Sequence, residues 1–528
     1  GGSIGVIGGR NLTNEDAFAL ARFAAEVLET PHVDFRVGAQ TTTVNPLAPF
    51  GLEAFNTGLD AAEKAGAILV VGADVHDEVP VQWLRIRKGV KAGARLIVAN
   101  PRATEADRIA FHRLRHRPGA ELALVTGILA ALVESPPIDA EGTPRDLSGL
   151  AQAIGSATVE KAAAHAGVDA VTIRAAAATL ASANNPLVYV GARLAIRHDA
   201  AAIGLAVGNL GRALGHPARV NFLVEGANGR GAEWAGLVPG DGGLPAGEIV
   251  ARAAAGEIKA LYIVGENLLE THPDAAQARE ALERAEVVVV HELFPTLTAQ
   301  AAHVVFAATS VMEKDGTLTS MEGRLQRIWQ GVRPDADRAP DWRIVSDLAA
   351  AMGAGLGYVA SADVTRDLLA DLPAYAPLNG LLPGSGGALV RRAPADAYGE
   401  IESLSVPASE RGDDATGMTL VTYPEIVGHE TIVNETPELL VTVPEAYVEV
   451  NRDDAATLGI ADGAMVEVRG PAGMVTRVAR VNGRVPSGTV FAPENLGAPR
   501  INAVLRWSHD VTRVTVHPVP VAIMAGAR

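Results

Sequence analysis

The feature that most constrains this fold is a repeat of one short apolar run followed by one amphipathic stretch, over the first three-quarters of the chain. Runs that are apolar on both faces are typical of strands covered by helices on both sides, and parallel strands need helical crossovers of this length. The predicted strands are residues 67–72, 94–99, 187–191, 260–265, 286–290 and 303–307. The predicted helices are residues 14–28, 79–92, 121–134, 169–183, 200–214 and 274–286. This alternation predicts doubly wound α/β layers.

The pattern changes after a segment rich in proline, glycine and serine at residues 373–417, which we interpret as a linker. Beyond it the apolar residues alternate with a period of two. The predicted strands are residues 419–423, 447–450, 465–469, 474–481, 488–491 and 513–521, with one helix over residues 453–458 that ends at Gly459. Many short strands with one helix predict a separate domain that is mostly β-barrel.

Composition excludes several classes of function. A net charge of -16 argues against a nucleic-acid partner, because phosphate binding requires concentrated lysine and arginine. The absence of cysteine excludes disulfides, thiolate–zinc sites and cysteine-ligated iron–sulfur clusters within these 528 residues. No apolar run reaches the roughly 18–20 residues of a membrane span, and no signal peptide is visible. The chain does not begin with Met and residues 3–8 already read as a strand, so we expect it to be cut from a larger protein.

Three segments, in order along the chain, resemble the molybdopterin oxidoreductase superfamily, which includes formate dehydrogenases and nitrate reductases. They are LIVANPRATEADRIA (96–110), LYIVGENLLETHPD (261–274) and VEVNRDDAATLGIADGAMVEVRGPAG (448–473). The resemblance implies molybdopterin-oxidoreductase-like α/β domains followed by a double-psi β-barrel. The implied division is residues 1–40 and 185–350 for one α/β domain, 41–184 for an inserted α/β domain, 351–414 for an extension and linker, and 415–528 for a molybdopterin-dinucleotide-binding-like barrel.

Within that superfamily, EKDGTLTSMEGRLQR (313–327) and TPHVDFR (30–36) resemble the large G subunit of bacterial NADH:quinone oxidoreductase, or complex I. This resemblance implies a scaffold or assembly portion without chemistry of its own, in the cytoplasmic arm at the inner face of the cell membrane. The implied partners are other subunits of the peripheral arm and the iron–sulfur section of the same subunit, which would precede Gly1 and hold the clusters. We expect its removal to expose an apolar patch near Ile4, Val6 and Phe23.

In molybdenum-containing members of the superfamily a soft or anionic side chain ligates the metal. Alignment on VDFRVGAQTTT (33–43) puts the ligand position at Gln40, and a neutral glutamine is a poor ligand. Residues 41–43 are all threonine, so an alkoxide ligand from one of them is the alternative. A polar loop that satisfies its own backbone fits these residues better. We therefore expect no metal.

The positions that resemble pterin-nucleotide anchors also depart from the family pattern. Asn100 stands for an aspartate and loses charge-assisted hydrogen bonds, Asp74 places an anion where phosphates would approach, and the barrel entry at residues 428–436 carries Glu430 and Glu435. The retained candidate cofactor-binding positions are Gly72, Asn100, Arg102, Thr104, Gly265 and Asn267. Glycine can persist for turn geometry and arginine for capping strand ends, so we expect no cofactor in this chain.

Two other functions stay open at this point. One is a molybdenum oxidoreductase of the formate dehydrogenase type, using bis-molybdopterin guanine dinucleotide with a non-cysteine ligand. The other is a small-molecule-binding module that uses the vacated cleft. A basic run at residues 108–117 could dock an anionic partner, although a solvated and partly ion-paired face is the better interpretation. The glycine-rich residues 226–236 are a weak candidate for a phosphate loop, and Trp234 there is a candidate filler of vacated space.

Overall fold

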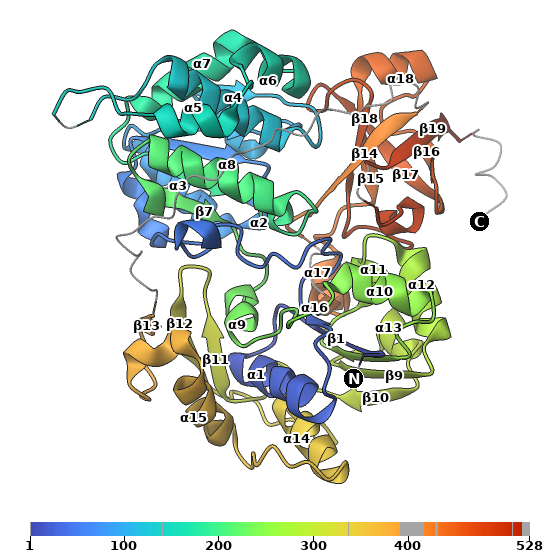
Figure 1. The fold of residues 1–528 in the computed structure, drawn as a ribbon. Helices are drawn as coiled ribbons and strands as arrows, with labels where there is room; N and C mark the ends of the chain where they lie inside the picture. The colour runs from blue at the N-terminus through green and yellow to red at the C-terminus, as the bar shows by residue number, and fades with distance from the viewer. Residues whose placement is uncertain are drawn as a thin grey trace. The chain divides into compact units, whose positions relative to one another are not determined.

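The computed structural model describes residues 2–139, 141–335, 337–390, 417–427, 431–508 and 511–519 (Figure 1). These residues form two compact units. The first unit contains residues up to 44, residues 196–198 and residues 224–390; the second contains residues 45–195, residues 199–223 and the described residues from 417 onward. No helix in the described ranges has both the length and the apolar character needed to cross a membrane.

The first unit is built on a five-stranded parallel sheet with the strand order β10-β9-β8-β1-β2. Val6 of β1 packs into one apolar core with α1, whereas its neighbour Ile7 packs into another core with α10 and α12. Both faces of the sheet are therefore covered, as the doubly wound prediction requires. The strands are β1 (Ile4–Gly8), β2 (Val33–Asp34), β8 (Ala260–Val264), β9 (Val287–Glu292) and β10 (Val304–Ala307); the helices are α1 (Asn14–Arg22), followed by a π-helical turn (Phe23–Val27), α9 (Gly229–Trp234), α10 (Ala246–Ala254), α11 (Leu268–Thr271), α12 (Ala275–Arg284) and α13 (Leu297–Gln300).

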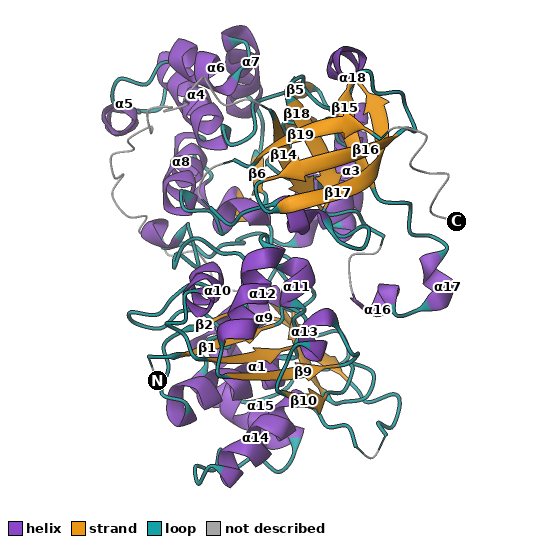
Figure 2. Cartoon of the chain, turned by 90° about the vertical axis from the view of Figure 1, so that its right-hand side faces the viewer, coloured by secondary structure: helices purple, strands orange, loops and turns teal. Residues whose placement is uncertain are grey.

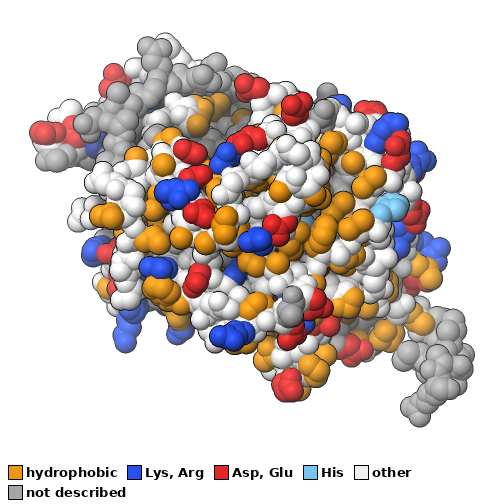
Figure 3. All heavy atoms as spheres, turned by 90° about the horizontal axis from the view of Figure 1, so that it is seen from below, with side chains coloured by type: hydrophobic (Ala, Val, Ile, Leu, Met, Phe, Trp, Pro, Cys, Tyr) orange, Lys and Arg blue, Asp and Glu red, His pale blue; other side chains and the backbone are white. Residues whose placement is uncertain are grey.

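The apolar patch expected near Ile4, Val6 and Phe23 is not found among the residues that the structure describes. Val6 and Phe23 are fully buried, because β1 lies inside the sheet between β8 and β2 and Phe23 packs on Tyr262. On the face drawn in Figure 3, apolar side chains are interspersed with charged ones. That expectation was wrong because an N-terminal strand need not be an edge strand.

A small antiparallel sheet and two helices complete the first unit. The sheet consists of β11 (Gly316–Thr319), β12 (Arg324–Ile328) and β13 (Ala388–Leu389), and the helices are α14 (Asp341–Ala351) and α15 (Ser361–Asp371). The described part of the predicted linker contains a short 3₁₀ helix (Pro373–Leu378) and β13, which pairs with β12. Residues 391–416 of that linker lie outside the described residues.

The second unit contains another parallel sheet, with the strand order β5-β4-β3-β6-β7. Because β6 pairs with β3, the domain boundary expected at residue 185 is wrong: residues 187–190 and 220–222 belong to this sheet. Strands of the two sheets have the same apolar character, so the sequence does not show which sheet a run joins. The strands are β3 (Ala67–Val71), β4 (Arg95–Ala99), β5 (His112–Leu114), β6 (Leu187–Val190) and β7 (Val220–Phe222); the helices are α2 (Val75–Glu78), α3 (Pro80–Lys91), α4 (Glu121–Glu134), α5 (Ser148–Ile154), α6 (Val159–Ala166), α7 (Ala170–Ala181) and α8 (Ala200–Ala213).

The C-terminal part of the second unit is a closed barrel with the strand order β14-β18-β15-β17-β16-β19 (Figure 2). Two of its strand pairs, β14–β18 and β15–β17, are parallel, and closure leaves no sheet edge. The predicted interrupting helix is α18 (Arg452–Leu458), ended by Gly459 in the left-handed region. The strands are β14 (Met418–Tyr423), β15 (Tyr447–Asn451), β16 (Met465–Gly470), β17 (Gly473–Asn482), β18 (Thr489–Pro493) and β19 (Arg513–Pro518), and two short helices, α16 (Thr431–Asn434) and α17 (Pro437–Leu440), precede β15. The predicted combination of α/β layers and a barrel is confirmed.

Candidate functional site

Each parallel sheet has a point where the strand order reverses, and ligands of open α/β sheets bind outside the carboxyl ends of the strands at such points. The point lies between β1 and β8 in the first unit and between β3 and β6 in the second. A Cβ added to Gly9 would lie 2.1 Å from the carbonyl oxygen of Gly265, and one added to Gly191 would lie 2.1 Å from that of Gly72. Gly72 and Gly265, both predicted from the sequence, therefore take matching places: each packs against a glycine that tolerates no Cβ, and each has a positive φ, +63° and +62°, that itself favours glycine.

Asn267, the other candidate in the first unit, is bound by its own chain. Its Oδ1 accepts hydrogen bonds from the backbone N–H of Thr298 at 3.2 Å and from the Thr298 hydroxyl at 2.8 Å. These bonds connect the start of α11 to α13. The buried amide is accordingly used to hold two short helices together.

Gln40, at the expected metal-ligand position, is also held by neighbouring backbone. Its N–H donates to the carbonyl oxygen of Ile196 at 2.8 Å, and its Oε1 accepts from the N–H of His198 at 3.3 Å. The partly buried Arg36 forms an ion pair with the buried Asp34 at 2.9 Å and donates to the carbonyl oxygens of residues 41 and 43. The geometry agrees with a polar loop that satisfies its own backbone.

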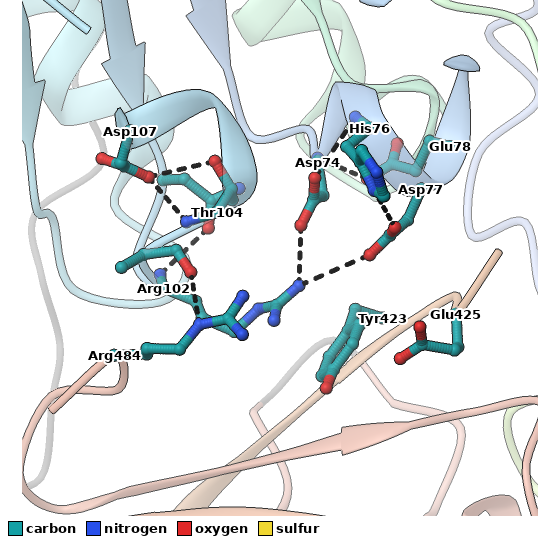
Figure 4. Close-up of polar contacts among 12 residues, drawn as sticks. Asp74, His76, Asp77, Glu78, Arg102, Thr104, Asp107, Tyr423, Glu425 and Arg484 are labelled. Carbon is teal, nitrogen blue, oxygen red and sulfur yellow. Dashed lines mark hydrogen bonds and ion pairs between the residues drawn. The ribbon is translucent and has the colours of Figure 1, made fainter. Parts of the chain in front are cut away.

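The remaining predicted residues, Asn100, Arg102 and Thr104, lie together at the carboxyl end of β4 in the second unit. The Asn100 Oδ1 accepts from the N–H of Arg102 at 2.9 Å and closes a turn. Thr104 and Asp107 form a reciprocal capping arrangement at the start of a short 3₁₀ helix (Figure 4). Asn100 and Thr104 thus shape the loop that presents Arg102.

The Arg102 side chain is only 4% exposed and is surrounded by anions. Its guanidinium donates to Asp74 Oδ2 at 2.7 Å and to Glu449 Oε1 of the barrel at 3.0 Å, with Asp77 at 4.0 Å. The guanidinium carbon lies 3.7 Å from the centre of the Tyr423 ring. Figure 4 shows Arg102 extended toward Asp74 and Asp77 on one side and Tyr423 on the other.

The barrel holds Glu449 in place through further hydrogen bonds. The Tyr423 hydroxyl donates to Glu449 Oε1 at 2.9 Å, and the Asn482 amide donates to Oε2 at 2.9 Å. The Tyr423 oxygen lies 3.0 Å from the Tyr447 hydroxyl, which donates to Glu425 at 2.7 Å. Because the carboxylate has partners on both oxygens, Glu449 is preorganised to receive Arg102.

Two buried carboxylates face the buried Arg102 guanidinium, and the nearby Arg484, whose Nε lies 3.9 Å from Glu449 Oε2, is exposed. Among the buried groups, negative charge is therefore in excess. Burial raises the pKa of Asp74 to about 6, although Arg102 opposes that rise, and Asp77 adds to it. The sequence identified Arg102 and Asp74 but not Glu449 or Tyr423. No sequence signal marked Glu449, because side chains alternate across a strand and a glutamate between Val448 and Val450 is the pattern of a solvent-facing position.

The other sequence candidates have structural partners. In the basic run, Arg113 donates to the carbonyl oxygen of Asp107, Arg115 to those of Asn100 and Arg102, and Arg117 to those of residues 164 and 165. These arginines support the Arg102 loop and its neighbours, which agrees with the paired interpretation of the run.

The glycine-rich segment is a joint within the first unit. Asn228 accepts from the N–H of Thr319 at 2.6 Å and donates to the carbonyl oxygen of Leu12 at 2.7 Å. Trp234 packs edge-on against Tyr375, with ring centres 5.7 Å apart. At the barrel entry, Glu430 lies outside the described residues and Glu435 is exposed.

A second buried charge network occupies the EKDGTLT segment of the first unit. Lys314 Nζ lies 2.7 Å from Asp16 and 3.1 Å from Asp341, and His291 Nδ1 lies 3.2 Å from Asp341. The buried Glu15 accepts from the N–H of Thr317 at 2.7 Å. The segment therefore fastens the first turns of α1 and α14 to β11.

Comparison with known proteins agrees with this architecture. The model of the molybdopterin oxidoreductase family matches residues 2–351, and that of the "Molydopterin dinucleotide binding domain" matches residues 418–518. The chain has a TM-score of 0.78 with acetylene hydratase from Pelobacter acetylenicus, covering 98% of this chain and 86% of that one. At 16% identity, this likeness shows the fold alone.

Three similar proteins illustrate the range of oxidoreductases that this chain resembles. The chain is 27% identical to the NADPH-Fe(3+) oxidoreductase subunit alpha of Geobacter sulfurreducens, over 96% of this chain and 63% of that protein. It is 27% identical to the F420-dependent formate dehydrogenase subunit alpha of Methanocaldococcus jannaschii, over 93% and 81%. It is 27% identical to an NADH-quinone oxidoreductase G subunit of Rhizobium meliloti, over 98% and 62%, so it spans less than two-thirds of the first and last of these relatives. The family match covers well over half of the chain, which therefore belongs to the molybdopterin oxidoreductase family.

Proposed function

We propose that this chain is the non-catalytic scaffold portion of a G-type subunit in the cytoplasmic arm of an NADH:quinone oxidoreductase. The match to the Rhizobium meliloti protein over 98% of the chain supports this, as does the resemblance of residues 313–327 to G subunits. In this role the chain packs against other subunits of the arm, at the inner face of the membrane. Iron–sulfur clusters belong to a preceding section of the same subunit.

The observation that carries the proposal is the occupation of Arg102. Its guanidinium already binds Asp74 and Glu449, and both carboxylates are almost completely buried. A molybdopterin dinucleotide would bring a diphosphate toward an edge where buried negative charge already exceeds positive charge. Uncompensated buried charge is strongly unfavourable, so these residues do not fit that cofactor.

The expected metal-ligand position supports the same proposal. Gln40 offers a neutral amide whose oxygen accepts from the backbone of His198, and the chain contains no cysteine to supply a thiolate. Neutral amides are poor ligands for a metal that prefers soft or anionic groups. We therefore assign no chemical step to this chain.

Elemental analysis tests the proposal. The full-length subunit, purified with its complex, should contain only traces of molybdenum and tungsten and should not reduce a viologen dye with formate. Near-stoichiometric molybdenum or tungsten would contradict the proposal.

Deletion tests the scaffold role itself. Removing residues 1–528 from the full subunit should lower the yield of assembled complex on native gels. NADH–ferricyanide activity of the isolated cluster-bearing subunits should persist. Intact assembly with loss of that activity would instead assign a redox role to this chain.

The second candidate function is a molybdenum oxidoreductase of the formate dehydrogenase type with a bound molybdopterin guanine dinucleotide. It is favoured by the two family models, which together cover residues 2–351 and 418–518, and by the match to the formate dehydrogenase relative. A threonine hydroxyl among residues 41–43 would then have to ligate the metal. The elemental analysis separates the two candidates directly.

A further inference from the structure

The barrel and the sheet of the second unit are joined by contacts between residues far apart in the chain. Arg102 follows β4 and Glu449 lies in β15, yet their side chains are 3.0 Å apart. Beside them the N–H of Ala103 donates to the carbonyl oxygen of Arg484 at 2.8 Å, and Arg484 Nε donates to the carbonyl oxygen of Ala103 at 3.1 Å. A second ion pair joins Arg193, just after β6, to Glu494 of the barrel.

The two cross-barrel ion pairs, Arg102–Glu449 and Arg193–Glu494, have the same polarity. In both of them the arginine comes from the carboxyl edge of the sheet and the carboxylate comes from the barrel. The planar guanidinium binds carboxylate and phosphate oxygens with the same fork of donors. Arg193 follows β6 at the reversal point of strand order, and Arg102 follows β4, the strand next to β3. Both arginines are therefore positioned to bind an anion at the carboxyl edge of the sheet, and here the anions come from the chain itself.

We propose that Arg102 is an anion-binding residue whose anion is built into the protein, the carboxylates of Glu449 and Asp74, and that this bond fastens the barrel to the sheet. The inference deepens the proposed function, on which it rests, since it explains how a scaffold without a dinucleotide keeps its barrel attached. The built-in anion satisfies Arg102 and excludes a dissociable anion from the same edge.

Chemical rescue tests this assignment. Replacing Glu449 by alanine removes the heavy atoms that acetate contains, so acetate can enter the space and accept from Arg102, Tyr423 and Asn482. The change removes the Arg102–Glu449 bond between barrel and sheet but leaves Asp74 beside Arg102. Acetate in place of chloride, at equal ionic strength, should restore much of the lost stability.

The measurements are the melting temperature of the 528-residue chain and the hydrogen exchange of the Ala103 amide. In Glu449→Ala, acetate should raise the melting temperature along a saturating curve and slow exchange at Ala103. Acetate at a hundred times its dissociation constant shifts the equilibrium about a hundredfold toward the folded form. Inorganic pyrophosphate should leave the native chain unchanged.

The matched control is Glu467→Ala, which removes a half-buried barrel carboxylate paired with the exposed Arg469 at 2.6 Å. Acetate should not stabilise it more than chloride does. A second control adds Arg102→Met to Glu449→Ala, which removes the anion's partner and should abolish the rescue. If Glu449→Ala does not fold, Glu449→Gln should still speed exchange at Ala103 at least tenfold more than Glu467→Gln.

Any of four results would overturn the inference. The first three are no acetate-specific effect in folded Glu449→Ala, the same acetate effect after Arg102→Met is added, and equal exchange at Ala103 in the two glutamine variants. Stabilisation of the native chain by pyrophosphate would also overturn it, because the edge would then accept a dissociable anion. These failures would leave a metal-free scaffold possible. Conversely, stoichiometric molybdenum would refute the proposed function even if acetate rescue succeeded.

Discussion

Replacing Lys314 by methionine removes the cation that holds two buried carboxylates together. Lys314 is 2.7 Å from Asp16 and 3.1 Å from Asp341, and these residues lie in the first turns of α1 and α14. Methionine preserves most of the side-chain volume, so the change tests charge more than packing. The expected consequence is a local weakening of the joint between the two helices.

The magnitude follows from the carboxylates. Burial alone would raise the pKa of Asp341, but Lys314 and His291 lower it to about 2. A shift of nearly two units corresponds to about 2–3 kcal/mol for this group. Removing one partner of a buried pair typically costs about 3–5 kcal/mol. We expect a loss in that range, which is roughly a 150- to 5000-fold change in the opening equilibrium.

Hydrogen exchange of the Trp342 amide provides the assay, because this N–H donates to Asp16 at 3.0 Å. A local reporter separates the opening of this joint from the unfolding of the rest of the chain. Exchange at Trp342 should rise by that factor in Lys314→Met. Adding Asp16→Asn and Asp341→Asn should recover part of the loss, since the buried charge is then gone.

The matched control is Lys259→Met, which breaks an exposed pair with Glu286 and should leave Trp342 unaffected. The pH dependence gives a further check. The folded-state pKa of Asp341 lies below its unfolded value, so its contribution is complete above about pH 4 and is lost as pH falls toward 2. Equal exchange at Trp342 in the Lys314 and Lys259 variants would refute the charge argument.

Three smaller changes have defined directions. Burial raises the pKa of Glu15 to about 7, so the folded chain binds this proton more tightly than the unfolded chain does, and the free energy of unfolding should increase as pH falls from about 7 to 4.5. Glu15→Gln should reduce this pH dependence, measured as the difference between urea unfolding at pH 8 and at pH 5. Gly191→Ala brings a methyl group against the Gly72 carbonyl oxygen and should cost about 1–3 kcal/mol by thermal unfolding, whereas Gly355→Ala, with nothing within 4 Å, should not. Asn209 is buried, and its amide has no hydrogen-bond partner among the residues described, so Asn209→Leu should raise the unfolding free energy by about 1 kcal/mol in the same assay.

Long periodic segments of the fold were predictable from the sequence. Residues 121–134 form a helix with the predicted bounds, because a run of good helix formers begins at Glu121 and stops at Ser135. Strands β2, β5 and β7 contain only two or three residues, too few to show a period, and were missed. The sheet that β6 joins depends on pairing with β3, more than a hundred residues earlier, which no local pattern records.

The candidate site was predictable to the same extent. Arg102 stood out because its loop resembles a family motif, and the structure puts it at the carboxyl edge of a sheet. Its partner Glu449 is 347 positions away in a different fold element, so the pairing becomes visible only in three dimensions. The motif therefore identified the cation, Arg102, from the sequence, whereas its anionic partner Glu449 was identified only from the structure.

The two reversal points together explain why a family motif can survive without its ligand. In the first unit Arg10, shortly after β1, forms an ion pair with Glu225 at 2.8 Å, as Arg102 does with Asp74 and Glu449 in the second. Each arginine near a reversal point is thus neutralised within its own unit. Replacing such an arginine would leave carboxylates without their cation, partly buried at Glu225 and deeply buried at Asp74 and Glu449. Folding alone therefore requires the arginine. An arginine at the position of Arg102 is consequently no evidence of a bound cofactor. The charge of the side chains around it is the better criterion: buried carboxylates, such as Asp74 and Glu449, indicate that the protein itself supplies the anion.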